Sequence, residues 1–191
     1  MIRENYPFIP ATQKEILRTE VHCIVESVIP DFCKVVREVE LSGSTITLSS
    51  RISNLSTEIF DIEEYCHNFM QFDGYPIDQN VRVAFRGPLL HSVVRGELAV
   101  GSNWYEPVTF DEALGTIALA CEKSAYSEYP DTVTLSDRRT GTYVTIRDGF
   151  IASRGYQWMS EYCICPESFH QMTIYPLKEV QFFRDYTFGI L

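Results

Sequence analysis

Residues 132–150 read TVTLSDRRTGTYVTIRDGF, and this stretch carries the clearest strand pattern in the chain. Apolar residues stand at every second position on both sides of a polar turn: Val133, Leu135, Val144 and Ile146. This period is typical of strands with one buried face. Asp148-Gly149 forms a second tight turn, after which residues 150–153 return. The stretch therefore predicts a three-stranded antiparallel meander.

Further strands are predicted on both sides of this meander. Residues 38–48 alternate apolar and polar side chains around Ser42-Gly43, which predicts an N-terminal hairpin. Residues 81–86 and 97–100 have the pattern of short strands. The aromatic segment 172–191 adds one or two more strands at the C-terminal end.

Three other segments show helical spacing. Residues 12–29 and 109–121 each begin with a Thr-x-x-Glu capping box, and each continues with apolar residues at i, i+4, i+7 and i+11. Residues 57–70 have a similar apolar stripe behind a cluster of acids. We therefore expect an α+β fold, in which about three helices pack with a mostly antiparallel sheet that contains the N-terminal hairpin and the C-terminal meander.

Length and composition predict one domain over residues 1–191. The chain has 191 residues, of which 45% are hydrophobic and 22% charged, as in an average globular domain. No Ser/Gly/Pro-rich linker divides it. These values exclude a disordered chain, a coiled coil and a collagen-like repeat.

The charge is strongly acidic and unevenly spread. The chain has 26 Asp+Glu against 16 Lys+Arg, a net charge of −10, and residues 61–131 hold 12 of the acids but only 4 of the bases. A surface of this sign repels phosphate backbones, so we expect no general nucleic-acid binding. It suits a protein partner of basic or mixed charge, but a solvated acidic face that maintains solubility is the simpler explanation.

The expected compartment is the cytoplasm. Residues 1–5 lead into no apolar segment of a signal peptide, and no apolar run approaches the ~20 residues that a membrane helix needs. The six cysteines are then expected to be reduced core residues rather than disulfides.

The residues that could carry chemistry form one cluster. Cys163, Cys165 and His170 supply the thiolates and imidazole that zinc prefers, and Cys66 or His67 could complete a site. Cys-x-Cys is tighter than the usual spacing of zinc ligands, so buried core thiols are the alternative. The chain contains no phosphate-binding loop, His-Glu-x-x-His or Gly-x-Ser-x-Gly motif, so no catalytic residue is assigned.

Acidic, aromatic and arginine side chains are the candidates for contact with a partner. Asn103–Pro107 is a turn-like segment with two large aromatics, and residues 138–141 form a charged hairpin tip. The candidate partner-binding residues are Glu58, Asp61, Glu63, Glu64, Trp104, Tyr105, Arg138 and Arg139. The acids also suit helix starts, and the arginines suit an ordinary polar turn.

The leading interpretation is a non-catalytic acidic protein-binding domain. Such a domain would act as an inhibitor, an immunity-type antitoxin or an assembly component, and it would need no cofactor. One alternative is a zinc protein or enzyme that uses Cys163, Cys165, His170 and Cys66 or His67. Another is a homo-oligomeric structural protein that associates through its apolar C-terminus, residues 188–191.

Overall fold

The computed structural model describes residues 11–123 and 131–191. Residues 1–5, on which the expectation about a signal peptide rests, lie outside the described part. Within it the chain forms strands and no helix, and hence no helix that is long and apolar enough to cross a membrane. The α+β prediction with three helices is therefore wrong, because the described chain is all-β.

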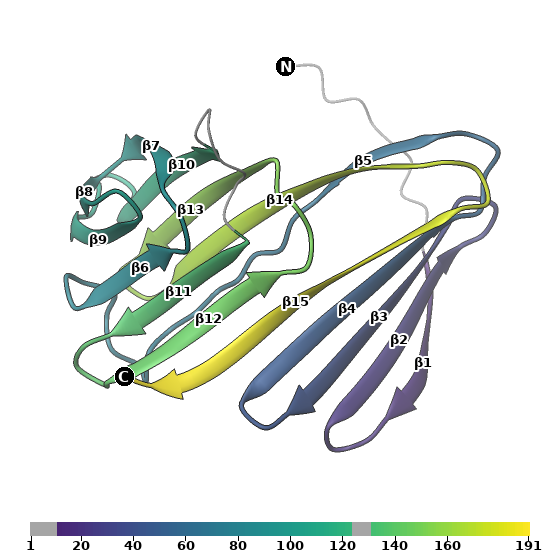
Figure 1. Ribbon diagram of the computed structural model, residues 1–191, viewed down its shortest axis with the longest axis horizontal. Helices are drawn as coiled ribbons and strands as arrows, with labels where there is room; N and C mark the ends of the chain where they lie inside the picture. The colour runs from purple at the N-terminus through teal and green to yellow at the C-terminus, as the bar shows by residue number, and fades with distance from the viewer. Residues whose placement is uncertain (1–10, 124–130) are drawn as a thin grey trace.

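Two antiparallel sheets pack face to face (Figure 1). Among the described residues, the larger sheet has ten strands in the spatial order β1 (Thr12–Arg18), β2 (His22–Ile29), β3 (Cys33–Ser42), β4 (Thr45–Asn54), β15 (Glu179–Ile190), β12 (Thr142–Asp148), β11 (Thr132–Asp137), β6 (Val81–Phe85), β9 (Trp104–Thr109) and β8 (Glu97–Val100). The smaller sheet has five in the order β5 (Phe60–Glu64), β14 (Ile164–Ile174), β13 (Arg154–Ser160), β10 (Thr116–Lys123) and β7 (Leu89–Arg95).

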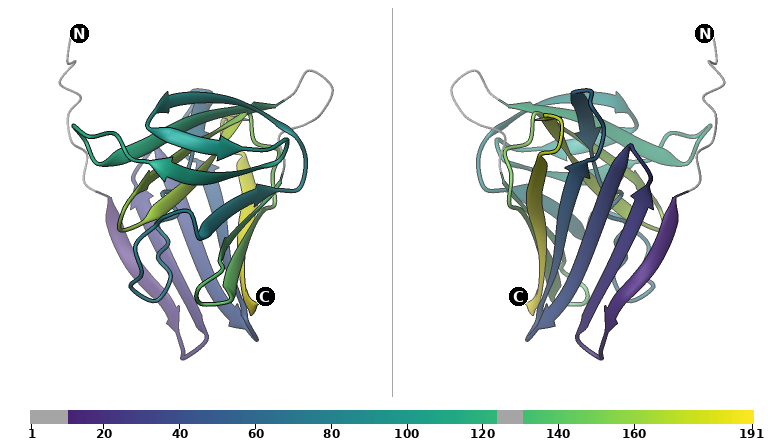
Figure 2. Two further views of the ribbon diagram at one scale, coloured as in Figure 1. Left: turned by 90° about the vertical axis from the view of Figure 1, so that its left-hand side faces the viewer. Right: turned by 90° about the vertical axis from the view of Figure 1, so that its right-hand side faces the viewer.

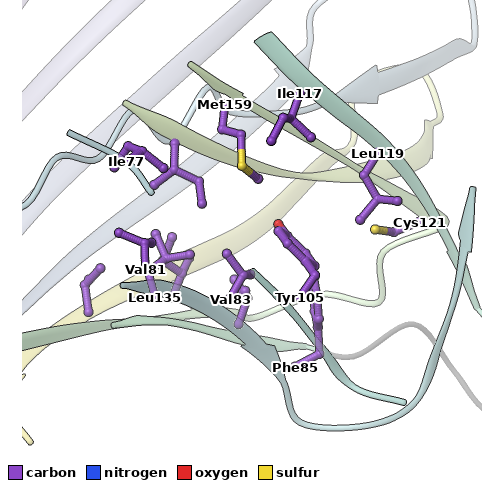
Figure 3. Packing of buried hydrophobic residues seen from close by; sticks show 14 of the residues in the cluster. Ile77, Val81, Val83, Phe85, Tyr105, Ile117, Leu119, Cys121, Leu135 and Met159 are labelled. Carbon is purple, nitrogen blue, oxygen red and sulfur yellow. The ribbon is translucent and has the colours of Figure 1, made fainter. Parts of the chain in front are cut away.

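The hydrophobic core lies between the two sheets. Val81, Val83 and Phe85 of β6 point inward at every second position and meet Ile117 and Leu119 of β10 (Figure 3). Each such side chain that is fully removed from water contributes about 1.5–3 kcal/mol. The period-2 pattern of the sequence therefore fixes which face of each central strand is buried.

The larger sheet extends well beyond the smaller one. β1 to β4 spread away from β7, β10 and β13, as both views of Figure 2 also show. All of β1 is exposed, and β2 is only half-buried along its length. The inner face of the larger sheet, defined as the face that carries Ile146 and Arg184 towards the core, is consequently open over β1 to β3.

The first expected helix is instead a hairpin of β1 and β2, in which Thr12 faces Val28 and Arg18 faces Cys23. Residues 21–29 are rich in Val and Ile, whose branched side chains favour extended backbone. The helical spacing of Leu17, Val21, Ile24 and Val28 is thus accidental.

The other two expected helices are also strands with irregular ends. Within residues 57–70, β5 covers the first half and pairs with β14. In 109–121 the side chain of Asp111 does accept hydrogen bonds from the amides of Ala113 and Leu114, as a helix cap would. The chain then turns at Gly115, which has a positive φ of 61°, and enters β10.

The predicted hairpin and two strands of the predicted meander are present. β3 and β4 pair around a turn at residues 43–44, and β11 pairs with β12. The expected return strand 150–153 does not form beside β12. Gly149 donates to the carbonyl of Phe183, Ser153 donates to that of Phe169, and the intervening residues carry the chain from the larger sheet to β13 of the smaller one.

Candidate active site

Glu64 and His170 lie side by side on the core-facing side of the smaller sheet. They are register partners across β5 and β14. Cross-strand partners project to the same face, and their Cβ atoms are about 5 Å apart. His170 alternates in phase with the buried Met172 and Ile174, so both side chains point toward the larger sheet. Both remain partly exposed.

The larger sheet supplies a buried ion pair to the same place. Asp148 of β12 and Arg184 of β15 are register partners, and Arg184 Nε donates to Asp148 Oδ1 over 2.5 Å. Arg184 is 3% exposed and Asp148 is 6% exposed. Removing an arginine from water is costly unless a carboxylate compensates its charge, so each residue depends on the other. Burial works against the charge of Arg184, but the neighbouring Asp148 raises the pKa of the guanidinium above its usual range.

Aromatic rings hold His170 in a fixed orientation. The ring of Phe150 stacks on the imidazole with centroids 4.3 Å apart and an interplanar angle of 8°. Phe182 contacts the same imidazole edge-on at 5.1 Å and 85°. Arg184 lies over the Phe150 ring, with Cζ 5.4 Å from its centroid. The imidazole is therefore clamped between apolar surfaces close to a buried positive charge.

Unpaired polar atoms are concentrated at this position. In the part of the chain that the structure describes, four buried side-chain atoms have no hydrogen-bond partner, and three of them are Glu64 Oε2, His170 Nδ1 and Arg184 Nη2. Native proteins leave few buried polar groups unsatisfied, and those few are often functional. The group of Glu64, His170, Asp148 and Arg184 is hereafter the acid–base cluster.

Burial shifts the two central residues toward their neutral forms. It raises the pKa of Glu64 despite the opposing positive charges of Arg184 and Arg37. Burial lowers the pKa of His170. The negative charge of Asp148 raises this pKa in part, and the positive charge of Arg184 lowers it further. Burial thus favours the protonated form of the Glu64 carboxyl and the unprotonated form of the His170 imidazole.

A hydrogen-bonded rim borders the cluster where the chain leaves β5. Tyr186 Oη donates to Asn68 Oδ1 over 2.6 Å, and Asn68 Nδ2 donates to the carbonyl of Pro166 over 2.6 Å. Cys66 Sγ lies 3.9 Å from the same tyrosine oxygen. Burial and the nearby thiol raise the pKa of Tyr186, so its hydroxyl stays protonated and able to donate.

An open groove lies beside the cluster on the inner face of β1 to β4. Its volume is about 620 Å³, and it is lined by Gln13, Cys23, Val25, Ser27, Val35, Arg37, Val39 and Leu48. Leu48 is the register partner of Arg184, which places the groove on the same face as the buried ion pair. The positive charge of Arg37, which lines the groove, acts on the Glu64 carboxylate, so the groove lies near the cluster.

The four acids predicted as one partner-binding set point in different directions. Asp61 and Glu63 lie on the outer face of the smaller sheet, where Asp61 accepts from Thr173 and Glu63 pairs with Arg154 at 2.7 Å. Glu58 is exposed in the turn before β5. Glu64 alone turns inward, because neighbouring residues of a strand project to opposite faces.

The remaining partner candidates have structural contacts. Tyr105 is fully buried and donates to Gln157 Oε1 over 2.8 Å. Trp104 is half-buried beneath Arg82, whose Cζ lies 4.4 Å from the ring centroid. Arg138 lies 3.7 Å from Glu106, and Arg139 pairs with Asp137 and Asp78. Contact of these residues with a partner stays a prediction.

The five zinc candidates do not converge on one site, although His67 and Cys165 both lie against Glu167. Cys165 and His170 are five residues apart on β14 and therefore project to opposite faces, while Cys163 precedes the strand and contacts Ser160. Cys66 faces Tyr186 at the rim of the cluster. In residues 11–123 and 131–191, no group of three or more His, Cys, Asp or Glu is placed to hold a metal ion.

Sequence reasoning missed Asp148, Phe150 and Arg184. It assigned the first two to a turn and a return strand, and Arg184 to an aromatic tail. A signal was present in β15. Every second residue on the face that carries Phe182 and Tyr186 is apolar or aromatic, except Arg184. A lone charge on the buried face of a strand indicates a buried partner of opposite charge.

Comparison with solved structures identifies the fold. A putative aldose 1-epimerase from Escherichia coli matches with a TM-score of 0.67 at 8% identity, over 94% of this chain and 69% of that one. A galactose mutarotase-like protein from Clostridium acetobutylicum matches with a TM-score of 0.63 at 12% identity, over 95% and 66%. An aldose epimerase homologue from C. elegans matches with a TM-score of 0.61 at 9% identity, over 94% and 69%.

The chain has the galactose mutarotase-like β-sandwich fold, and it spans about two thirds of the length of these proteins. No protein-family model matches it, and no curated protein matches its sequence. This finding contradicts our interpretation as a non-catalytic inhibitor, immunity-type or assembly domain, because these three structural neighbours are described as epimerases or mutarotase-like.

Proposed function

We propose that this protein binds a free aldose beside the acid–base cluster and interconverts its two anomers, as an aldose 1-epimerase does. The observation that carries the proposal is the pairing of Glu64 and His170 across β5 and β14. A nearby groove contributes Arg37, whose charge acts on Glu64. The fold shared with a putative aldose 1-epimerase supports the same reaction class. The activity is inferred from the site, because the low identity carries only the fold.

Interconversion of anomers needs one acid and one base. The base removes the proton of the C1 hydroxyl, the acid gives a proton to the ring oxygen, and the C1–ring-oxygen bond breaks to form the open aldehyde. Rotation about the C1–C2 bond and the reverse proton transfers then close the ring as the other anomer. Atoms and charges balance without a cofactor, and general acid–base catalysis of this kind contributes about 10²–10⁴-fold.

The directions of the two pKa shifts support an assignment of the two roles. His170, whose pKa is lowered, is the base for the C1 hydroxyl, and Glu64, whose pKa is raised, is the acid for the ring oxygen. Proton transfer leaves an imidazolium and a carboxylate. The imidazolium faces the negative charge of Asp148, and the carboxylate faces the positive charges of Arg184 and Arg37. Asp148 therefore favours the imidazolium, and Arg184 and Arg37 favour the carboxylate, although Arg184 opposes the first charge and Asp148 the second.

The groove suits the body of a sugar. Val25, Val35 and Val39 offer apolar surface for the C–H faces of a pyranose. Gln13 and Ser27 add hydrogen-bonding side chains at the same surface. Ligand sites in proteins usually combine mostly apolar walls with a few polar groups that orient the ligand.

Polarimetry of freshly dissolved α-D-glucose and α-D-galactose tests the proposal. The protein should accelerate the approach to the anomeric equilibrium in proportion to its concentration. Glu64→Gln and His170→Asn should each lower kcat by at least ten-fold, since each removes one proton-transfer group without a large change in volume. A protein that does not accelerate mutarotation of any common aldose contradicts the proposal.

Two matched variants separate chemistry from general damage. Glu63→Gln changes the neighbouring carboxylate on the opposite face of β5, and His22→Asn changes a histidine that pairs with Glu38 at the far side of the larger sheet. Both should retain wild-type rates. If they lose activity together with Glu64→Gln, the effect reflects folding rather than the acid–base cluster.

The cytoplasm is the compartment that we propose. The support is chemical: Cys23, Cys33, Cys66, Cys163 and Cys165 are unpaired thiols in the structure. Unpaired thiols persist where glutathione and thioredoxin keep them reduced. Fractionation of the native host followed by immunoblotting tests this location directly.

A further inference from the structure

A second pocket lies on the outer face of the smaller sheet. Its volume is about 350 Å³, and it is lined by His67, Phe69, Tyr156, Trp158 and Glu167. Glu167 and His170 are three residues apart on β14, so they project to opposite faces of the sheet. The pocket is thus separate from the acid–base cluster, and none of its residues has a role in the proposed reaction.

A nearly buried carboxylate forms part of the pocket wall. The side chain of Glu167 is 10% exposed, and its Oε1 lies 3.3 Å from His67 Nε2 and 3.5 Å from Cys165 Sγ. Within the described residues, no hydrogen bond reaches its Oε2. Burying a carboxylate is costly without a positive partner. His67 supplies one only when its imidazole is protonated. Arg154 does not supply one, because it is paired with Glu63 at 2.7 Å and lies over Phe169.

The aromatic rings of the pocket are set at right angles rather than side by side. Phe69 and Trp158 are 6.1 Å apart with an interplanar angle of 90°, and His67 is tilted by 53° against Phe69 at 5.5 Å. A compact, rounded cation can contact several ring faces together, and the negative faces of the rings attract it.

We propose that this pocket binds a methylated ammonium group, held by the rings of Phe69, Tyr156 and Trp158 and balanced by the carboxylate of Glu167. The net charge of −10 favours the approach of any cation. The group belongs either to a free small molecule or to a methylated lysine of a protein. The binding chemistry is the same in both cases.

Tryptophan fluorescence provides a direct probe. The chain has 2 Trp, so Trp104→Phe leaves Trp158 as the single reporter inside the pocket. Choline should change its emission saturably. The neutral analogue 3,3-dimethyl-1-butanol, which has the same shape without the charge, should bind at least ten-fold more weakly.

The carboxylate is tested in the same single-tryptophan background. Glu167→Gln keeps the size of the side chain but removes its charge, and it should weaken choline binding by at least ten-fold. Asp61→Asn, on the same face but outside the pocket, where the native carboxylate accepts from Thr173, should leave the affinity unchanged. Circular dichroism confirms that each variant is folded. If Glu167→Gln does not fold, Phe69→Leu at a 58% exposed position replaces it and should also weaken binding.

The outcomes distinguish this proposal from its rivals. Equal affinity for the neutral analogue would make the pocket merely apolar and overturn it. A response to methyl glucoside but not to choline would make it a carbohydrate site, and no response to choline would also refute it. Tighter binding of a trimethyllysine peptide than of choline indicates a protein source, and the reverse indicates a small molecule. Glu64→Gln should leave choline binding intact, so failure of the epimerase proposal leaves this one standing.

Discussion

Arg184 donates to Asp148 across β15 and β12, and both side chains are only 4% exposed. At the adjacent register position the order is reversed, so that Arg147 of β12 pairs with Asp185 of β15 at 2.5 Å. This second pair lies on the outer face, with Arg147 53% exposed. The same two strands thus carry a buried and an exposed ion pair of identical chemistry.

We expect neutralisation of the aspartate to lower the free energy of unfolding by very different amounts in the two pairs. Asp148→Asn leaves Arg184 buried without its counter-charge and should lower the free energy of unfolding by about 3–5 kcal/mol. Asp185→Asn breaks a pair whose arginine is half exposed, so that water can solvate the arginine left behind, and it should cost clearly less, about 1 kcal/mol. Urea unfolding of both variants measures the difference, and equal costs would contradict the burial that separates the pairs.

His170 predicts a loss of stability on mild acidification. Burial lowers its folded-state pKa below the ordinary 6.5, so the unfolded chain binds the proton more readily. The stabilisation is complete above pH ~6.5 and falls as the pH drops through the folded-state pKa. The wild-type protein should therefore lose more unfolding free energy between pH 7.5 and 5 than His170→Asn does. Urea titrations at both values give the comparison.

Glu64 affects the pH dependence of stability in the opposite direction. Burial raises its folded-state pKa, so its protonated form is favoured in the folded protein and its contribution is lost as the pH rises through that pKa. Glu64→Gln cannot ionise and keeps the neutral shape. This variant should therefore be more stable relative to wild type at pH 8 than at pH 4, which the same titrations measure.

We expect the loss of the buried hydrogen bond of Tyr105 to lower the free energy of unfolding measurably. Tyr105→Phe keeps the ring but removes the hydroxyl that donates to Gln157, a residue only 1% exposed. Leaving a buried acceptor without this donor should cost about 1–3 kcal/mol. Tyr175→Phe, at a 59% exposed position, should cost less than about 0.5 kcal/mol. Thermal or urea unfolding tests both.

The buried thiols predict a pattern of alkylation. Burial raises the pKa of Cys121 to about 12, and burial together with Glu167 raises that of Cys165. Because the thiolate is the reactive form, iodoacetamide at pH 8 should spare both in the folded protein. Half-buried Cys23 and Cys66 should react sooner. Peptide mass spectrometry after short exposure measures the order, and early labelling of Cys121 would contradict the buried position of β10.

The alternation of apolar and polar side chains predicted the strands correctly where the local pattern determines the structure. Residues 132–137 and 142–148, the hairpin of β3 and β4, and the short strands β6 and β8 all follow from it. Helical spacing misled in three places, because apolar residues on both faces of a strand can match it by chance. At Asp111 even the capping hydrogen bonds form, but Gly115 ends the turn after them.

The acid–base cluster was only half visible in the sequence. Glu64 and His170 were singled out, but for a partner surface and a zinc site respectively. Their pairing depends on the register of β5 with β14, and the counter-charges come from two further strands of the other sheet. Those long-range pairings leave no local signature, so a single sequence does not bring the four residues together.

The position of β15 has a consequence for how the chain acquires its structure. β15 lies between β4 and β12 and joins the N-terminal meander to the rest of the larger sheet. On the ribosome, β1 to β4 therefore emerge long before residues 179–190 can cover the open edge of β4. The larger sheet is complete only when β15 pairs with β4, which is a contact between distant parts of the chain. This requirement slows folding, and until then the edge of β4 can pair with other nascent chains. A chaperone that shields strand edges during synthesis would act at this step.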